Sequence, residues 1–221
     1  MLLKQWESNY TEEFTVVDKQ YNSKDEYMDI DIHIPQIVHN TSNSNFQSIN
    51  DKIIQMTEEW LNDVKKNIDE LDLKNIPPLI RYGLASTYEF TNTEGIISFY
   101  IDYYQYTGGA HGYVTKVAYN IDAETGKELK LNQLFKEKCD YKSIINTEIE
   151  KQINKTPEIY FIGDLGFHGI DANVSYYIKS NELVIYYQLY EIAPYVTGFP
   201  QFSIDTKIFN ENYLYNKINN M

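Results

Sequence analysis

The sequence has one cysteine, few basic residues and no long apolar run. A single cysteine, Cys139, among 221 residues excludes an intramolecular disulfide and a multi-cysteine zinc site. Its neighbours Lys138 and Asp140 give no clear activation of a thiolate, so we interpret Cys139 as structural. No stretch reaches the roughly 18–20 consecutive apolar residues that a membrane-spanning helix needs. Residues 1–10 also lack the apolar segment of a signal peptide.

The shortage of basic residues restricts the possible partners. The chain has 19 Lys and Arg against 32 Asp and Glu, which gives a formal net charge of −13 at pH 7. Because contacts to phosphates and to anionic lipids need clustered Lys and Arg, this composition argues against binding to nucleic acid or to an anionic membrane surface. A basic partner is favoured instead, through faster encounter and better specificity.

What is present indicates a folded protein. Hydrophobic residues make up 43% of the chain and aromatic residues 15%, including 21 tyrosines. A chain of this length with so many aromatic residues can bury a core, and it suffices for one large domain or two small ones. No linker or internal repeat is visible, so any boundary falls near the glycine-rich segment 108–112.

The hydrophobic periodicity predicts an α+β fold, with antiparallel sheets, a long helix in the N-terminal half and a shorter helix in the C-terminal half. Apolar residues at steps of three and four predict the helices 46–71 and 141–153. Period-two alternation within 26–38 predicts a strand that ends at Pro35. Further strands are expected at 14–20, 79–92, 96–106, 113–121, 174–179, 183–189 and 202–204.

His111 is the sharpest single candidate for chemistry, because glycines on both sides permit a sharply bent backbone. It could be a general base or metal ligand, or it could bind the backbone at a structural corner. The other histidines, His33, His39 and His168, are not at short ligand spacing from it. Hydrolase, nucleotide-loop and zinc-helix motifs are missing, and the loop carboxylates are better explained as solvated. We therefore expect no catalytic residues, no metal and no cofactor.

The segment 187–200 is the second unusual feature, because a strand ends there in a loop rich in Tyr, Pro and Gly. Tyrosines on a rigid loop, here Tyr190 and Tyr195, suit contact with a protein or a glycan. Alternatively, the two rings cover the edge of the core and leave only their hydroxyls in water.

Several motifs occur together in a familiar order: Tyr106–Gly112, Asp122–Lys127, Leu131–Phe135 and Tyr190–Tyr195, followed by Gly198. Over about residues 12–205, the chain resembles paired domains of unknown function found outside Gram-positive cells. These occur in the ectodomain of the lysozyme-sensing anti-sigma factor and ahead of the catalytic domain in a peptidoglycan deacetylase. The resemblance implies a deacetylase-associated α+β domain at 10–107, a second α+β module at 108–208 and a polar tail at 209–221.

The resemblance also implies a function and a place. It suggests an extracytoplasmic, membrane-anchored or secreted binding domain that recognises a basic protein such as lysozyme and thereby controls its own proteolysis. The expected contact residues are His111, Gly109, Tyr190, Glu191 and Tyr195. A sigma factor would be reached only through a segment that this chain lacks. Two alternatives stay open: an enzyme or accessory module acting on cell-wall glycan, and a small lipoprotein without a defined partner.

Overall fold

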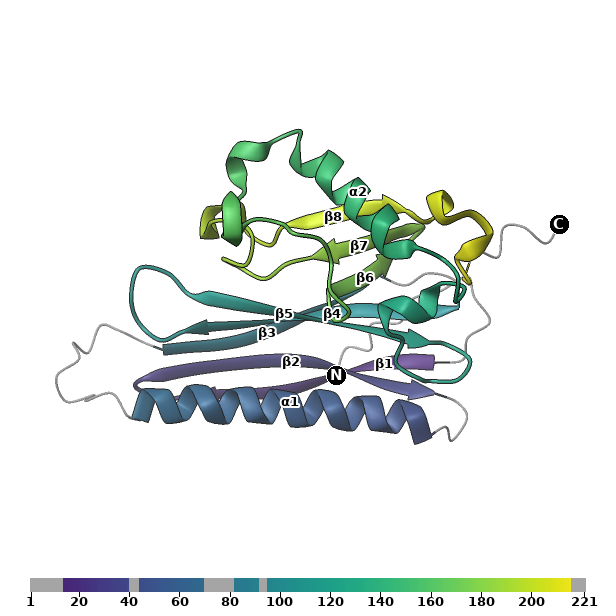
Figure 1. Cartoon of the computed structure of the whole chain (residues 1–221). Helices are drawn as coiled ribbons and strands as arrows, with labels where there is room; N and C mark the ends of the chain where they lie inside the picture. Colours follow the sequence, from purple (N-terminus) through teal and green to yellow (C-terminus); the bar gives the residue numbers. More distant parts are fainter. Residues whose placement is uncertain (1–13, 40–43, 70–81, 92–94, 216–221) are drawn as a thin grey trace. The chain divides into compact units, whose positions relative to one another are not determined.

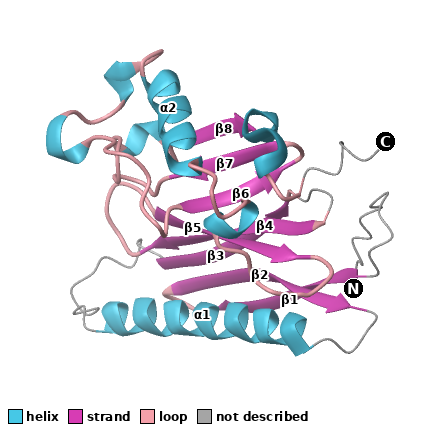
Figure 2. Cartoon of the chain, turned by 45° about the vertical axis from the view of Figure 1, so that its right-hand side comes forward, coloured by secondary structure: helices cyan, strands magenta, loops and turns pink. Residues whose placement is uncertain are grey.

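The computed structural model describes residues 14–39, 44–69, 82–91 and 95–215, and Figures 1 and 2 show the helices and strands that they form. The contacts divide the chain into two compact units. Unit one comprises 1–89, 101–116 and 124–127, and unit two comprises 90–100, 117–123 and 128–221. The predicted α+β class is confirmed, with the long helix in the N-terminal half and a shorter one in the C-terminal half. Within the described part of the chain, no helix is long and apolar enough to cross a membrane.

Unit one begins with an antiparallel hairpin of β1 (Phe14–Lys24) and β2 (Met28–His39). Asp25 closes the turn, since its Oδ1 accepts hydrogen bonds of 2.8 and 2.7 Å from the amides of Tyr27 and Met28. The expected end of the strand at Pro35 is wrong, because β2 continues to His39. Pairing of β2 with β3 stops at Ile32, so Pro35 lies where one side of β2 needs no ladder hydrogen bond.

The helix α1 (Ser44–Asp69) follows, and its apolar stripe packs on the sheet as the periodicity predicts (Figures 1 and 2). The stripe is buried at Phe46, Ile49, Ile53, Val64 and Ile68. After α1 the chain enters β3 (Tyr82–Phe90), which pairs in parallel with β2 from Met28↔Tyr82 to Ile32↔Ser86. This parallel pair is an exception within the predicted antiparallel sheets, because a long crossover helix returns the chain in the same direction.

Strands β4 (Ile96–Tyr106) and β5 (Tyr113–Asp122) complete a five-stranded sheet in the order β1-β2-β3-β4-β5. Both strands contribute residues to both units. The predicted turn between β3 and β4 lies at 93–95, of which 93 and 94 are outside the described residues.

Unit two contains α2 (Tyr141–Ile153), with the bounds that the sequence predicts, and a three-stranded antiparallel sheet. Asp140 caps the helix, accepting a 3.3 Å hydrogen bond from the Ser143 amide. The sheet consists of β6 (Ser175–Lys179), β7 (Glu182–Tyr186) and β8 (Gln201–Asp205), and α2 packs against β8 (Figure 2). The core between them is apolar, with Leu134, Ile145, Ile149, Ile178, Ile185 and Phe202 buried.

Buried polar side chains tie β6 to the ends of β4 and β5 within unit two. The Ser98 hydroxyl donates to Asn120 Oδ1 at 2.8 Å and accepts from the Ile178 amide at 2.9 Å. The Asn120 amide group in turn donates to the Tyr176 carbonyl at 2.8 Å. Because these groups satisfy one another, they can be buried without the cost of an unpaired polar atom.

The end of the chain adds aromatic residues to the same core. A 3₁₀ segment, Thr206–Asn212, buries Phe209, and Tyr213 is buried directly after it. The Tyr215 hydroxyl donates to Asp122 Oδ2 at 2.8 Å. The range 209–221, expected as a polar tail, thus contributes to the core of unit two as far as residue 215.

Candidate functional site

The glycine-rich loop between β4 and β5 in unit one carries His111 and Gly109. Gly108 and Gly109 have φ angles of 95° and 98°, which explains the need for glycine at both positions. The Tyr106 hydroxyl donates to the Gly109 carbonyl at 3.0 Å, and His111 Nδ1 lies 2.9 Å from the Gly112 carbonyl. The exposed imidazole of His111 therefore contacts the backbone of its own loop, as expected if this histidine stabilises the bend of the chain.

The described residues offer no metal site. Among them, no group of three or more His, Cys, Asp or Glu side chains could hold an ion. Cys139 packs against the core of unit two, and burial, together with the charge of Asp140, raises the pKa of its thiol. A thiol held in the protonated state is a poor nucleophile and a poor ligand.

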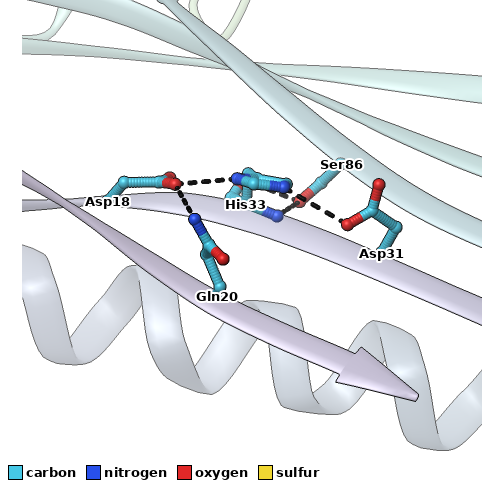
Figure 3. A network of polar contacts seen from close by, with 5 residues as sticks. All are labelled: Asp18, Gln20, Asp31, His33 and Ser86. Atoms are coloured by element: carbon cyan, nitrogen blue, oxygen red, sulfur yellow. Dashed lines mark hydrogen bonds and ion pairs between the residues drawn. The ribbon is translucent and has the colours of Figure 1, made fainter. Parts of the chain in front are cut away.

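A polar network that the sequence did not reveal surrounds His33 on β2 (Figure 3). His33 Nδ1 lies 2.8 Å from Asp18 Oδ2, and His33 Nε2 lies 3.2 Å from Asp31 Oδ1. Gln20 donates to the same Asp18 oxygen at 2.7 Å. Burial alone raises the pKa of Asp18, but the hydrogen bonds from Gln20 and His33 and the attraction to His33 outweigh it and hold this pKa below its ordinary value.

The network includes a serine, yet it is not a nucleophilic triad. The Ser86 hydroxyl donates to the His33 backbone carbonyl at 2.8 Å and accepts from the His33 backbone amide at 3.0 Å. It is thus bound to the main chain of β2 rather than to the imidazole, as Figure 3 shows. Ser86 thereby extends the contact between β2 and β3 by one residue beyond the Ile32↔Ser86 pair.

Unit two carries a different kind of feature, an exposed apolar surface on two loops. We call it the two-loop surface and define it by Ile159, Ile162, Leu165, Tyr190 and Val196. The Thr197 hydroxyl donates to the Ile159 carbonyl at 3.2 Å, and the Phe161 amide donates to the Ile192 carbonyl at 2.9 Å. These hydrogen bonds join the loop after α2 to the loop between β7 and β8.

The exposure of this surface is unusual for a folded domain. Val196 is 91% exposed, Ile162 88% and Leu165 67%. Single exposed apolar side chains are common, but several of them on adjacent loops are typical of surfaces that bind a partner.

The two loops that carry this surface are predominantly acidic. The loop 154–174 and the loop 187–200 together contain four carboxylates and one basic residue, Lys155. The four carboxylates belong to Glu158, Asp164, Asp171 and Glu191. A partner that covers the apolar side chains therefore meets negative charge in these segments, which favours a basic partner.

Three of the residues predicted for contact share the loop between β7 and β8. Tyr190 adopts a positive φ of 67°, and Glu191 Oε2 accepts a 2.7 Å hydrogen bond from the Gln188 amide. The rings of Tyr190 and Tyr195 have centroids 5.6 Å apart. Tyr190, Glu191 and Tyr195 are thus brought together in unit two, whereas His111 and Gly109 share a loop of unit one.

A groove of about 440 Å³ lies in unit two between the end of α2 and the loop that follows it. It is lined by three aromatic residues, Tyr160, Phe161 and Phe167, and by Glu150, Ile162 and His168 among others. This groove was not predicted from the sequence. The glycines at 163, 166 and 169 between aromatic residues are the signal that could have suggested a shaped loop.

Two known protein families match successive segments of the chain, in the order that the resemblance predicts. Residues 21–114 match the family described as Deacetylase PdaC, and residues 132–207 match a family of unknown function, DUF3298. The first segment is called the PdaC-like domain below and the second the DUF3298 domain, after the families they are similar to. This pairing confirms the prediction of a deacetylase-associated domain followed by a second module. The PdaC-like domain contains His33 and His111, and the DUF3298 domain contains the two-loop surface and the groove.

Solved structures of DUF3298 proteins share the fold across both domains. A family member from Bacteroides fragilis aligns with a TM-score of 0.60 and 20% identity, covering 93% of this chain and 95% of its own. A DUF3298 protein from Pseudomonas aeruginosa aligns with a TM-score of 0.58 and 16% identity, covering 90% and 93%. At these identities the likeness concerns the fold alone. No curated protein matches the chain.

Proposed function

We propose that this chain is a non-catalytic, extracytoplasmic binding domain that recognises a basic protein, with lysozyme as the candidate partner. The observation that carries the proposal is the two-loop surface, where strongly exposed apolar side chains lie on two loops that contain four carboxylates and one basic residue, Lys155. The extracytoplasmic location is part of the proposal and follows from the resemblance to paired domains, whose order the matches at 21–114 and 132–207 share.

The surface has the physical properties of a recognition site. A partner that covers Ile162, Leu165 and Val196 removes their apolar surface from water. Burial of apolar surface contributes a favourable free energy of about 25 cal/mol per Å², which supplies affinity. The carboxylates add attraction at long range, which raises the rate of encounter with a basic partner. The Tyr190 and Tyr195 rings provide further contact area and lose little side-chain entropy on binding.

In this proposal the chain is the sensing ectodomain of an anti-sigma factor. Binding of lysozyme to the DUF3298 domain would control proteolysis of the receptor and so release a sigma factor that another segment holds. A second candidate, an accessory module of a cell-wall deacetylase, is favoured by the match of residues 21–114 to the family described as Deacetylase PdaC.

Isothermal titration with lysozyme tests the proposal, using matched valine variants. Val196→Ser removes the most exposed aliphatic side chain of the two-loop surface, whereas Val38→Ser changes an exposed valine of β2 in unit one. We expect Val196→Ser to weaken binding about tenfold and Val38→Ser to leave it unchanged. Equal affinities for all three proteins would contradict the proposed surface, and no binding by the wild type would contradict lysozyme as the partner.

A further inference from the structure

The groove in the DUF3298 domain combines aromatic walls with a carboxylate. Tyr160, Phe161 and Phe167 line it, and Glu150 reaches it from the last turns of α2. Ile162 lines the groove and also belongs to the two-loop surface, so a partner that covers that surface reaches the groove entrance.

The loop that forms the groove is shaped by its own backbone. The Gly163 carbonyl accepts a 2.9 Å hydrogen bond from the Gly166 amide and lies 3.0 Å from His168 Nε2. A Cβ atom on Gly166 would come within 2.7 Å of the Phe161 carbonyl oxygen, so this close turn needs glycine. A groove with a fixed backbone loses little conformational entropy when it binds a ligand.

The charges near the groove favour a cation. Lys151, the basic residue next to Glu150, has its ammonium 2.6 Å from Glu148 Oε1 and is thereby paired with another carboxylate. The loop 154–174 that follows α2 adds Glu158, Asp164 and Asp171 against one basic residue, Lys155, so acidic residues outnumber basic ones along this segment. An anionic ligand would be repelled here, whereas a cationic one would be attracted.

We propose that the groove binds a lysine or arginine side chain presented by the basic partner, an inference that rests on the proposed function. The aliphatic stem of such a side chain packs along aromatic rings, and its cation lies favourably over a ring face. The Glu150 carboxylate then accepts a charge-assisted hydrogen bond from the cation. The groove thus supplies an anchor for one side chain, beside the broader apolar contact of the two-loop surface.

Small probes test the groove without the partner protein. N-acetyl-L-lysine amide and N-acetyl-L-arginine amide are titrated into the ¹⁵N-labelled chain, with uncharged N-acetyl-L-norleucine amide as the control. We expect a cationic probe to shift the amide signals of Gly163, Gly166 and His168 with saturation in the millimolar range, as suits so small a ligand. The norleucine probe should shift them little, and the stronger cationic probe identifies the preferred side chain.

Two charge-matched variants show whether Glu150 is responsible. Glu150→Gln and Glu182→Gln each remove one negative charge, but Glu182 is on β7 and does not line the groove. We expect Glu150→Gln to weaken binding of the cationic probe about tenfold, with signals outside the groove unchanged, and Glu182→Gln to have little effect. Equal effects of the two variants, or equal shifts with the norleucine probe, would overturn the inference.

The same variants separate this inference from the proposed function. In one outcome, lysozyme binds, Val196→Ser weakens that binding, and Glu150→Gln behaves like Glu182→Gln with both lysozyme and the cationic probe. This outcome supports the two-loop surface as the lysozyme contact and rejects the groove as a site for a cationic side chain. If lysozyme does not bind but the cationic probe saturates the groove through Glu150, then the groove is supported and lysozyme is rejected as the partner.

Discussion

The rings of Tyr190 and Tyr195 lie with their centroids 5.6 Å apart, at the two ends of one turn in the DUF3298 domain. Tyr190 holds its ring there from a left-handed backbone conformation, with a φ of 67°. Between them, Ile192 and Ala193 are buried and fix the turn to the core. The tyrosine pair is therefore presented on a backbone that the core holds in place.

This arrangement predicts a loss of lysozyme binding when one ring is removed. Tyr195→Ala should weaken binding by about tenfold or more, because aromatic residues often dominate contact surfaces. Tyr27→Ala, at an exposed tyrosine of unit one, is the control and should bind as the wild type does. Surface plasmon resonance measures both, and a normal affinity of Tyr195→Ala would exclude the tyrosine pair from the contact.

The groove loop makes a prediction about stability. Gly166→Ala should lower the free energy of unfolding by about 1–3 kcal/mol, because the new methyl group meets the Phe161 carbonyl oxygen. In Gly163→Ala the new methyl group has open space, and only the positive φ of 61° disfavours alanine. We expect this variant to lose about 1 kcal/mol of unfolding free energy. Urea unfolding measures both, and a larger loss for Gly163→Ala would contradict the described loop.

The Asp18–His33 contact predicts a pH dependence of stability. The pKa of Asp18 is lowered in the folded state, so this group stabilises the fold above its unfolded value near 3.8 and loses that effect as the pH falls through the folded value. Asp18→Asn should be less stable than the wild type by about 1 kcal/mol at pH 7, and the difference should shrink as the pH falls below 3.8. A difference that stays constant from pH 7 to pH 3 in denaturant titrations would refute the contact.

The ion pair between Asp102 and Lys116 in unit one predicts unequal effects of its two single substitutions. The Lys116 side chain is 5% exposed and that of Asp102 28%, and their charged atoms approach to 2.7 Å. Asp102→Asn removes the close carboxylate partner of a buried ammonium and should cost about 3 kcal/mol, whereas Lys116→Met leaves a carboxylate that still reaches water and should cost less. Burial already lowers the pKa of Lys116, against the attraction of Asp102 and Glu89.

A double-substitution cycle supplies the control for that pair. Asp102→Asn combined with Lys116→Met should be more stable than Asp102→Asn alone, because no buried charge then remains at position 116. Thermal unfolding of the four proteins measures this. Additive losses would mean that the two side chains do not interact.

The sequence was most informative where periodicity and helix-ending residues agree. The range Tyr141–Ile153 was predicted to the residue, because its apolar spacing is helical and Pro157 follows shortly after. The periodicity also predicted that the segment α1 is a long helix with one buried apolar stripe. The parallel pairing of β2 with β3 was not, because strand direction depends on how the crossover returns and not on the alternation within a strand.

The candidate site was predicted only in part, for a physical reason. Tyr190, Glu191 and Tyr195 were recognised because tyrosine, proline and glycine are concentrated in their loop. Ile162, Leu165 and Val196 were missed, since an apolar residue in a loop without periodicity gives no sign of whether it is buried. The contact of Asp18 with His33 depends on the pairing of β1 with β2, which the composition of either strand does not specify.

The central claim is that this chain binds lysozyme through apolar contact assisted by opposite charge. The most direct measurement is calorimetric titration of the wild type with native and with lysine-acetylated lysozyme. Each titration is run at about 50 mM and at about 300 mM NaCl, because salt screens the attraction between charges much more strongly at the higher concentration. We predict binding of native lysozyme that weakens with salt, and much weaker binding of the acetylated form. No binding of native lysozyme at either salt concentration, or equal affinity for both forms, would contradict the account.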